Sequence, residues 1–278
     1  MKKQIFEFDA LGTHWWIESL EEALSTELQE RIRNYVQDFE QTYTRFSDSS
    51  LLGQLNQHKR LSNPPTDMLT MLEYARDMCR ASDGVFNISV GGKLQELGYG
   101  RASSQGKISH DFWNDVKLTP EEICIPSEIS LDFGGFGKGW LIDILGKLLE
   151  GKGVSYYVIN GGGDIFVNAP EPLEFALEHP YDQTKSIGST KIQRGALAVS
   201  STVKRSWKQG SKTHHHIIDP RTGKPSQSDI VSTYVRAETA LLADTCATIL
   251  LIAPDLEPKL TDAYSLKTIL LRHDQLSP

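Results

Sequence analysis

A glycine-rich segment at residues 131–140 constrains the fold more than any other feature of the chain. It carries four glycines, Asp132 and Lys138, and it separates an apolar run at residues 129–131 from an amphipathic run at residues 141–149. This order predicts a strand, a tight turn and a helix. Glycine has no Cβ, so its backbone N–H groups can approach a ligand, and a following helix offers further N–H groups to a phosphate. Taken alone, however, the segment is best explained as a turn that needs glycine only for positive φ angles.

The overall composition indicates a globular protein and excludes several function classes. Of the 278 residues, 39% are hydrophobic and 23% are charged, which is typical of folded domains. The net charge of −7 argues against a nucleic-acid partner, because such binding depends on a basic surface. The three cysteines are far apart, so they indicate buried free thiols in a reducing compartment, not a disulfide framework or a zinc site.

The N-terminus has two lysines but no apolar core of a signal peptide, and no lipidation cysteine follows it. No segment has the apolar length that a transmembrane helix needs. From these features we expect a cytoplasmic protein, or an exported one from which the leader has been trimmed.

The order of periodic segments favours an α+β fold, because helices and strands mix without a regular βαβ period. We expect one domain over residues 1–278. The patterns predict helices at 20–43, 68–80, 141–149 and 239–252, and a loop at 91–110. They predict a strand pair within 4–17 and strands at 129–131, 154–159, 165–167, 173–177, 196–200, 216–218, 232–236 and 268–271.

The helix expected at residues 239–252 carries the first candidate site. Asp244 and Thr248 are four residues apart, so both side chains project from one helix face. Their neighbours are apolar, so the carboxylate needs a partner, and a hard divalent ion such as Mg²⁺ would suit both oxygen ligands. The alternative is that Asp244 pairs with an arginine or lysine while Thr248 bonds to a backbone carbonyl. On the helix alone the ion pair is favoured, because buried acids are usually paired.

Three adjacent histidines form the second candidate site. In a strand, His214 and His216 share one face and His215 lies on the other, so the three cannot reach one metal ion. A single imidazole that acts as a general base is a better use of this segment. The turn residues at 219–223 would hold the strand in place. A hairpin edge with solvated histidines is an equal alternative.

Two further groups of residues have structural and functional interpretations. The glycine run at residues 160–164 is best explained by tight turns, with Asp164 capping backbone N–H groups, although it could also pack closely behind the loop at 134–139. Phe46 and Tyr99 could flank a planar ring, but aromatic residues of this kind more often belong to the core.

Taken in chain order, these segments resemble the ApbE family of flavin transferases, which move FMN from FAD onto a protein hydroxyl. The resemblance extends from Gly12 to the helix that carries Asp244, and four motifs in one order are far more specific than any single motif. The segments that carry it are D-x-G-G-x-G-K-G from Asp132 with Asp143, residues 160–164, residues 216–223, and A-D-x-x-x-T from Ala243.

The resemblance implies a single ApbE-like, T-fold-like α+β domain of mixed, mainly antiparallel sheets with packed helices. It also implies that this domain takes FAD as its substrate and Mg²⁺ as its cofactor. It implies that the metal ligands are the Gly135 carbonyl, the Asp244 carboxylate and the Thr248 hydroxyl. It makes His216 the base near the attacked phosphate. The FAD contacts that it implies are Leu11, Phe46, Leu97, Gly98, Tyr99, Asp132, Lys138 and Ile218.

The implied function is Mg²⁺-dependent transfer of FMN from FAD to a serine or threonine hydroxyl of an acceptor flavoprotein, with release of AMP. An FAD pyrophosphatase would use the same site with water as the nucleophile, and an FAD-binding protein without turnover is the alternative of another class. Family members are often exported lipoproteins, and this N-terminus departs from that pattern.

Departures from the family pattern occur at four single residues and one three-residue segment, and they bear on metal affinity and rate more than on the fold. Leu11 replaces a usual methionine, Gly137 a usual alanine, and residues 200–202 a common Thr-Ser-Gly. Asn87 stands where aspartate is common, and Ala247 where some members place a second acid.

Overall fold

The computed structural model describes residues 5–99, 107–109, 111–203, 206–209, 212–215 and 217–276, with the backbone alone at residues 183, 206–209, 212–215 and 276. Its centre is a seven-stranded sheet in the order β1-β2-β6-β7-β8-β13-β14, and each neighbouring pair is antiparallel. The strands of this sheet are β1 (Ile5–Ala10), β2 (Thr13–Ser19), β6 (Tyr157–Gly161), β7 (Asp164–His179), β8 (Asp182–Ser201), β13 (Ile230–Ala237) and β14 (Lys267–Arg272).

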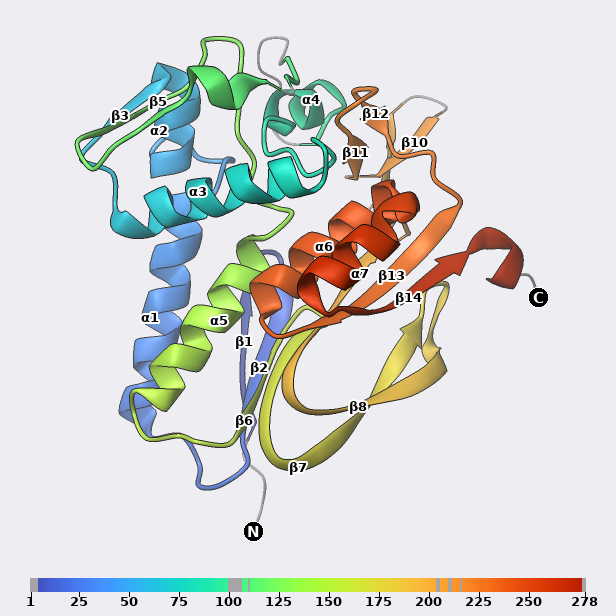
Figure 1. Ribbon diagram of the computed structural model, residues 1–278. Helices are drawn as coiled ribbons and strands as arrows, with labels where there is room; N and C mark the ends of the chain where they lie inside the picture. Colours follow the sequence, from blue (N-terminus) through green and yellow to red (C-terminus); the bar gives the residue numbers. More distant parts are fainter. Residues whose placement is uncertain are drawn as a thin grey trace.

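Smaller sheets lie above the main one in Figure 1. They are formed by β3 (Arg60–Ser62), β4 (Lys117–Leu118) and β5 (Glu122–Cys124), by β9 (Ser206–Gln209) with β10 (Lys212–His215), and by β11 (Ile218–Asp219) with β12 (Lys224–Pro225). The helices are α1 (Thr26–Tyr43), α2 (Leu51–His58), α3 (Thr66–Ala81), α4 (Gly91–Glu96), α5 (Gly137–Glu150), α6 (Ala240–Ile252) and α7 (Glu257–Tyr264). The mixed, mainly antiparallel α+β architecture is the predicted one.

The main sheet is apolar on both faces because it separates two hydrophobic cores. In β8, Ala196 and Ala198 belong to the large core under the helices, whereas Leu197 between them belongs to a second core. The second core is formed largely by β7 and β8, which continue as a long ribbon that curls away from the helices (Figure 1). The expected strands at 165–167 and 173–177 are therefore parts of one strand, β7.

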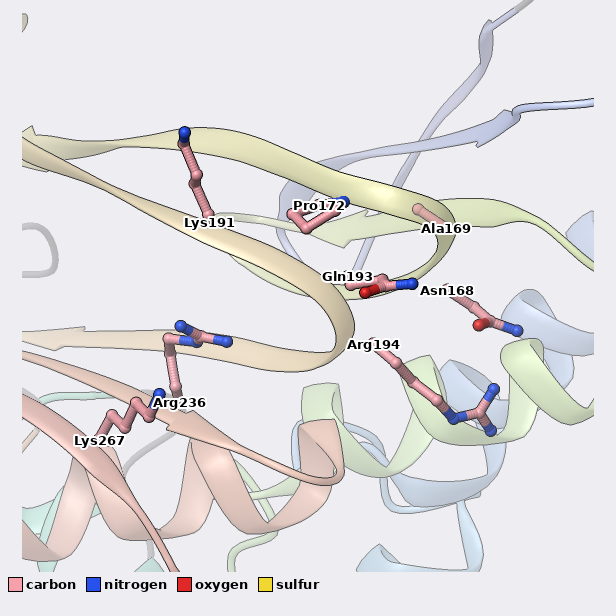
Figure 2. A pocket seen from close by; sticks show the side chains of 8 residues that line it. All are labelled: Asn168, Ala169, Pro172, Lys191, Gln193, Arg194, Arg236 and Lys267. Atoms are coloured by element: carbon pink, nitrogen blue, oxygen red, sulfur yellow. The ribbon is translucent and has the colours of Figure 1, made fainter.

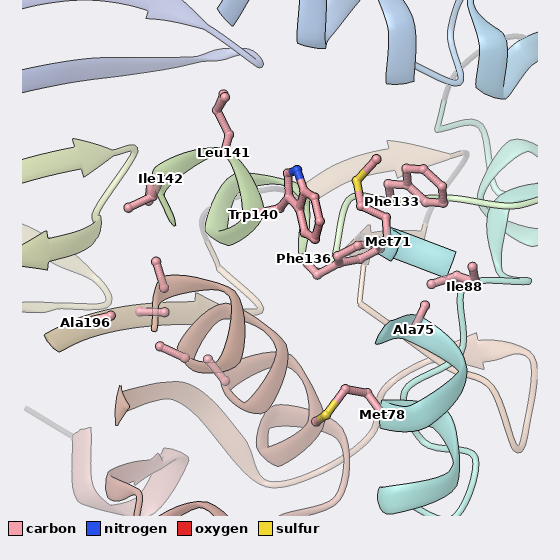
Figure 3. Close-up of a cluster of buried hydrophobic side chains, with 14 of the residues drawn as sticks. Met71, Ala75, Met78, Ile88, Phe133, Phe136, Trp140, Leu141, Ile142 and Ala196 are labelled. Carbon is pink, nitrogen blue, oxygen red and sulfur yellow. The ribbon is translucent and has the colours of Figure 1, made fainter. Parts of the chain in front are cut away.

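The large core fixes the start of α5, where the sequence predicts only a turn. Figure 3 shows Met71 and Ala75 of α3 facing Phe136 and Trp140 around the first turn of α5, and all four residues are buried. The helix begins at Gly137 and not at residue 141, so Lys138 lies in its first turn.

Three other sequence predictions are corrected. The apolar residues at 129–131 are buried but form no strand, and Ser130 makes only an isolated parallel bridge to Val90. The expected loop at 91–110 contains α4, and α2 and α7 were not predicted. The helix expected from residue 20 begins at Thr26, because the Ser25 hydroxyl accepts the N–H of Leu28 and caps it.

None of the helices among the described residues combines the length and the apolar character that a membrane span requires.

Candidate functional site

A buried cluster of three charged residues lies where α5, α6 and the start of β7 meet. The Lys138 ammonium group pairs with the Asp164 carboxylate, and it lies 3.2 Å from each carboxylate oxygen of Asp244. Burial alone would lower the pKa of Lys138, but the two carboxylates outweigh it and raise that pKa above its ordinary value. Burial raises the pKa of Asp244, although Lys138 and the Gly139 N–H oppose this shift. The cluster holds two carboxylates against one ammonium group, so it carries an excess of negative charge.

Two contacts between α5 and α6 fix the position of this cluster. The Asp143 carboxylate accepts the N–H groups of Ala240 and Leu241 at 2.8 and 2.9 Å, and so caps α6 from the neighbouring helix; its burial raises its pKa to about 6. One turn earlier on α5, Gly139 lies so close to α6 that a Cβ on it would lie 2.7 Å from the Leu241 Cα. This approach lets the Gly139 N–H donate to Asp244 at 3.0 Å.

Oxygen-bearing residues border the cluster on the side of β8. The Thr248 hydroxyl lies one turn after Asp244 on α6, 3.4 Å from the hydroxyl of Ser200. Gly135 is close to the same place, because a Cβ on it would lie 3.8 Å from the Thr248 methyl group. The structure therefore brings together the three residues predicted as metal ligands. Among the described residues, no three histidine, cysteine or acidic side chains form a metal-binding group, so any ion here would depend on carbonyl and hydroxyl oxygens as well.

A second group of predicted residues surrounds the buried guanidinium of Arg45. Arg45 pairs with the Asp132 carboxylate and donates to the Tyr99 carbonyl at 2.9 Å. Its Cζ lies 4.4 Å from the ring centre of Phe46 and 5.2 Å from that of Tyr99. Its Nη1 atom is buried and has no hydrogen-bond partner among the described residues. We call Arg45, Phe46, Tyr99 and Asp132 the arginine frame.

The arginine frame has an open side and is joined to the charged cluster. Phe46 is 50% exposed, so it is not the core residue that its type suggests. The Asp132 carboxylate also accepts the Gly134 N–H at 2.8 Å, and Gly134 directly precedes the predicted ligand Gly135. The glycine-rich segment is thus the backbone link between the two groups.

The remaining predicted contacts lie on elements around these groups. Leu97 and Gly98 end α4, in a turn where the Tyr99 N–H donates to the Leu94 carbonyl at 2.8 Å. Ile218 is buried in β11, and the turn of that hairpin approaches α4, because a Cβ on Gly223 would lie 3.7 Å from the Lys93 side chain.

Leu11 forms the β1–β2 turn with a positive φ of 51°, and its N–H donates to Glu40 of α1 at 3.2 Å.

His216, the predicted base, lies outside the described residues. The turn that follows it is well defined: Asp219 accepts the Arg221 N–H at 2.9 Å, and its carbonyl accepts the Gly223 N–H.

The positions that depart from the family pattern have clear local roles. Asn87 is buried, and it donates to the Ser109 carbonyl and accepts from Ser89. Gly137 is the first residue of α5 and therefore lies in regular helix. Ala247 is fully buried against β13, where its carbonyl accepts the Thr233 hydroxyl.

Sequence reasoning missed three residues of the site. Arg45 was not selected, although its position directly before Phe46 was a usable signal. Asp164 was interpreted as a turn cap, but it is 2% exposed and binds Lys138 as well as the Val199 N–H. Ser200 had no distinguishing signal beyond its departure from the family pattern.

Comparisons with known proteins agree with this architecture. The sequence pattern of the ApbE family matches residues 11–266. The FAD:protein FMN transferase of Escherichia coli K12 is 24% identical over 272 residues, which cover 89% of this chain and 78% of that protein. The enzyme of the same name from Vibrio cholerae is 25% identical over 266 residues, which cover 87% and 79% of the two chains.

Solved structures share the fold. The ApbE protein from Thermotoga maritima superimposes with a TM-score of 0.84 at 20% identity, covering 98% of this chain and 95% of that one. A mutant of the flavin transferase ApbE from Vibrio cholerae superimposes with a TM-score of 0.80 at 21% identity, covering 98% and 94%. With a family match over nearly its whole length and the same fold, this chain belongs to the ApbE family.

Proposed function

We propose that this chain is an FAD:protein FMN transferase, which moves FMN from FAD to a serine or threonine hydroxyl of an acceptor protein. The observation that carries the proposal is the buried cluster of Lys138, Asp164 and Asp244 beside the arginine frame. A flavin dinucleotide needs a surface for its planar rings and a charged site for its diphosphate, and these two groups are joined by the glycine-rich segment.

The arginine frame would hold the flavin nucleotide. Phe46 and Tyr99 offer aromatic surface, and Asp132 offers an acceptor. The Nη1 atom of Arg45, which has no partner in the described part of the chain, offers a donor that is costly to leave unpaired in a buried place. Lys138 would face the diphosphate from the first turn of α5, where the positive end of the helix dipole also favours an anion. The further contacts proposed for FAD are Leu11, Leu97, Gly98 and Ile218.

The residues around Asp244 fit a Mg²⁺ ion. Mg²⁺ prefers oxygen ligands and commonly takes one or two carboxylates together with substrate phosphates and water. Asp244, Thr248 and the carbonyl of Gly135 would supply three such oxygens, and the excess negative charge of the buried cluster favours a cation. When bound, the ion would neutralise charge on the diphosphate of FAD.

The transfer itself is a displacement at the phosphorus of the FMN moiety. The acceptor hydroxyl oxygen forms the new P–O bond, the bond to the AMP oxygen breaks, and AMP leaves. His216 would take the hydroxyl proton as general base. The protein contributes mainly by positioning and by electrostatic stabilisation, as in other phosphoryl transfers.

Incubation with FAD, Mg²⁺ and a threonine-containing acceptor peptide tests this proposal. We expect the peptide to gain the mass of the flavin mononucleotide group and AMP to appear in equal amount. Release of FMN and AMP without modification of any peptide would instead identify an FAD pyrophosphatase. Binding of FAD without AMP release would identify a flavin-binding protein.

A further inference from the structure

A basic pocket lies on the β7–β8 ribbon, away from the candidate functional site (Figure 2). Its volume is about 600 Å³. The lining residues are Asn168, Ala169, Pro172, Lys191, Gln193, Arg194, Arg236 and Lys267. Arg194 lies 3.6 Å from Glu150, the last residue of α5, whereas Lys138 is in the first turn of that helix. The rise of an α-helix therefore puts roughly 18 Å between the pocket and the buried cluster.

An enlarged β-bulge, with several residues of β7 opposite one residue of β8, forms the wall of the pocket. Asn168 pairs with Arg194, and the next pair along the ladder joins Leu173 to Ile192, so residues 169–172 of β7 lie opposite a single residue of β8. That residue, Gln193, donates to the Pro170 carbonyl at 3.0 Å and holds the bulge in place. Bulges of this kind recur next to functional sites, where they redirect side chains.

Most of the positive charges of the pocket lack an ion-pair partner among the described residues, although Glu174 of β7 is the direct ladder partner of Lys191. Arg236 and Lys267 are direct partners on β13 and β14, an arrangement of like charges that destabilises a sheet. Within the part of the chain that the structure describes, no ion pair involves Lys191, Arg236 or Lys267. Arg194 approaches Glu150, but its side chain is 63% exposed. Four cations around one concavity, in a chain of net charge −7, indicate an anionic ligand.

The spacing of the cations indicates the kind of anion. Lys191 and Arg194 are three residues apart on β8, and Arg236 pairs with Leu197, three residues further along. At the rise of a β-strand these intervals are about 10 Å each, which is more than one phosphate group spans. No aromatic side chain is among the described lining residues to stack on a base, which disfavours nucleic acid as the ligand. We propose that the basic pocket binds an extended acidic segment of a partner protein.

Fluorescence anisotropy with a labelled octaglutamate peptide tests this proposal on the full chain, without FAD. We expect saturable binding that weakens as salt is raised, because exposed charges are screened. Lys267→Glu and Lys191→Glu should each weaken binding on the order of tenfold, since repulsion replaces attraction. Both lysines are exposed, and thermal unfolding of each variant verifies that the fold is kept.

Arg80→Glu is the matched control, because Arg80 is an exposed cation on α3 outside the pocket. It makes the same change in net charge and should leave binding unchanged within about twofold. Equal weakening by Arg80→Glu would overturn the proposal, because attraction by overall charge would then explain the binding. Tighter binding of a single-stranded octathymidylate than of octaglutamate would also overturn it, since the pocket would then be a nucleic-acid site.

Discussion

The positive charges near the two ends of α5 lie in opposite surroundings. At its first turn, Lys138 is buried between two carboxylates, whereas at its last turn Glu150 borders a pocket whose cations are mostly exposed and unpaired among the described residues. Removing one partner of a buried ion pair typically costs several kcal/mol, but an exposed charge contributes little to stability.

The difference shows what each arrangement is suited to do. Charges that are buried and mutually bonded hold one geometry, which is what positioning a reactive phosphate requires. Charges that are exposed and lack partners keep their binding capacity for another molecule. The same helix thus connects a site suited to chemistry with a site suited to recognition.

Substitution of the two lysines tests this contrast most directly. Lys138→Met should lower the free energy of unfolding by about 3–5 kcal/mol, because Asp164 and Asp244 would be left buried without the ammonium group between them. Lys267→Met, the matched change in the basic pocket, should alter it by less than about 0.5 kcal/mol. Urea denaturation of both variants measures the difference. Equal effects would mean that the two ends of α5 do not differ as described.

Asp244→Ala tests whether the buried cluster serves chemistry or only stability. We expect Mg²⁺-dependent FAD cleavage to fall roughly a few hundredfold, because a charged metal ligand would be lost. The fold should be kept, because Lys138 retains Asp164 as its partner. Thr248→Ala, which removes only a hydroxyl, should have a smaller effect. Unfolding of Asp244→Ala with unchanged activity per folded molecule would identify Asp244 as a purely structural ion-pair partner.

His216→Asn sharpens the comparison by changing the chemistry while leaving both charged regions intact. Loss of a general base should slow transfer on the order of a hundredfold and leave FAD affinity nearly unchanged. His214→Asn and His215→Asn are the neighbouring controls and should be mild. Kinetics of the three variants on one acceptor peptide distinguish them. A large loss of activity in His214→Asn with normal activity in His216→Asn would show that the base is His214 and not His216.

Arg45→Lys tests a buried charge that is only partly satisfied. A lysine ammonium cannot reproduce the bonds to Asp132 and the Tyr99 carbonyl together with stacking on Phe46, so FAD should bind about tenfold more weakly. Arg80→Lys on the exposed surface of α3 should have no effect. Titration of FAD by flavin fluorescence measures both, and unchanged affinity in Arg45→Lys would exclude the arginine frame from the binding site.

The sequence predicted the local features of the site better than its assembly. The i, i+4 pair of Asp244 and Thr248 lies on the expected helix, and Thr239 caps that helix with its hydroxyl. The cluster around Lys138 could not be derived in this way, since Lys138 and Asp244 are 106 residues apart. Only the packing of α5 on α6 brings them together, and that packing depends on tertiary contacts that no local pattern encodes.

Apolar runs and glycines caused the clearest errors in the fold. The run at residues 129–131 is buried under helices, and a short apolar run does not distinguish that environment from a strand. Gly91 favours a loop in the sequence, but it begins α4. A Cβ on it would lie 2.8 Å from the Leu131 carbonyl oxygen. At this position glycine is needed for close packing, and not for an unusual backbone angle.

The close approach of Gly139 to α6 has a practical consequence for genetics. A single added methyl group would force α5 away from Leu241 and break the bond from the Gly139 N–H to Asp244, although no ionisable group would be added or removed. A Gly139→Ala allele would therefore leave the net charge of the chain unchanged. In a complementation experiment, this allele would show whether the cell requires only the presence of the protein or also its catalytic turnover.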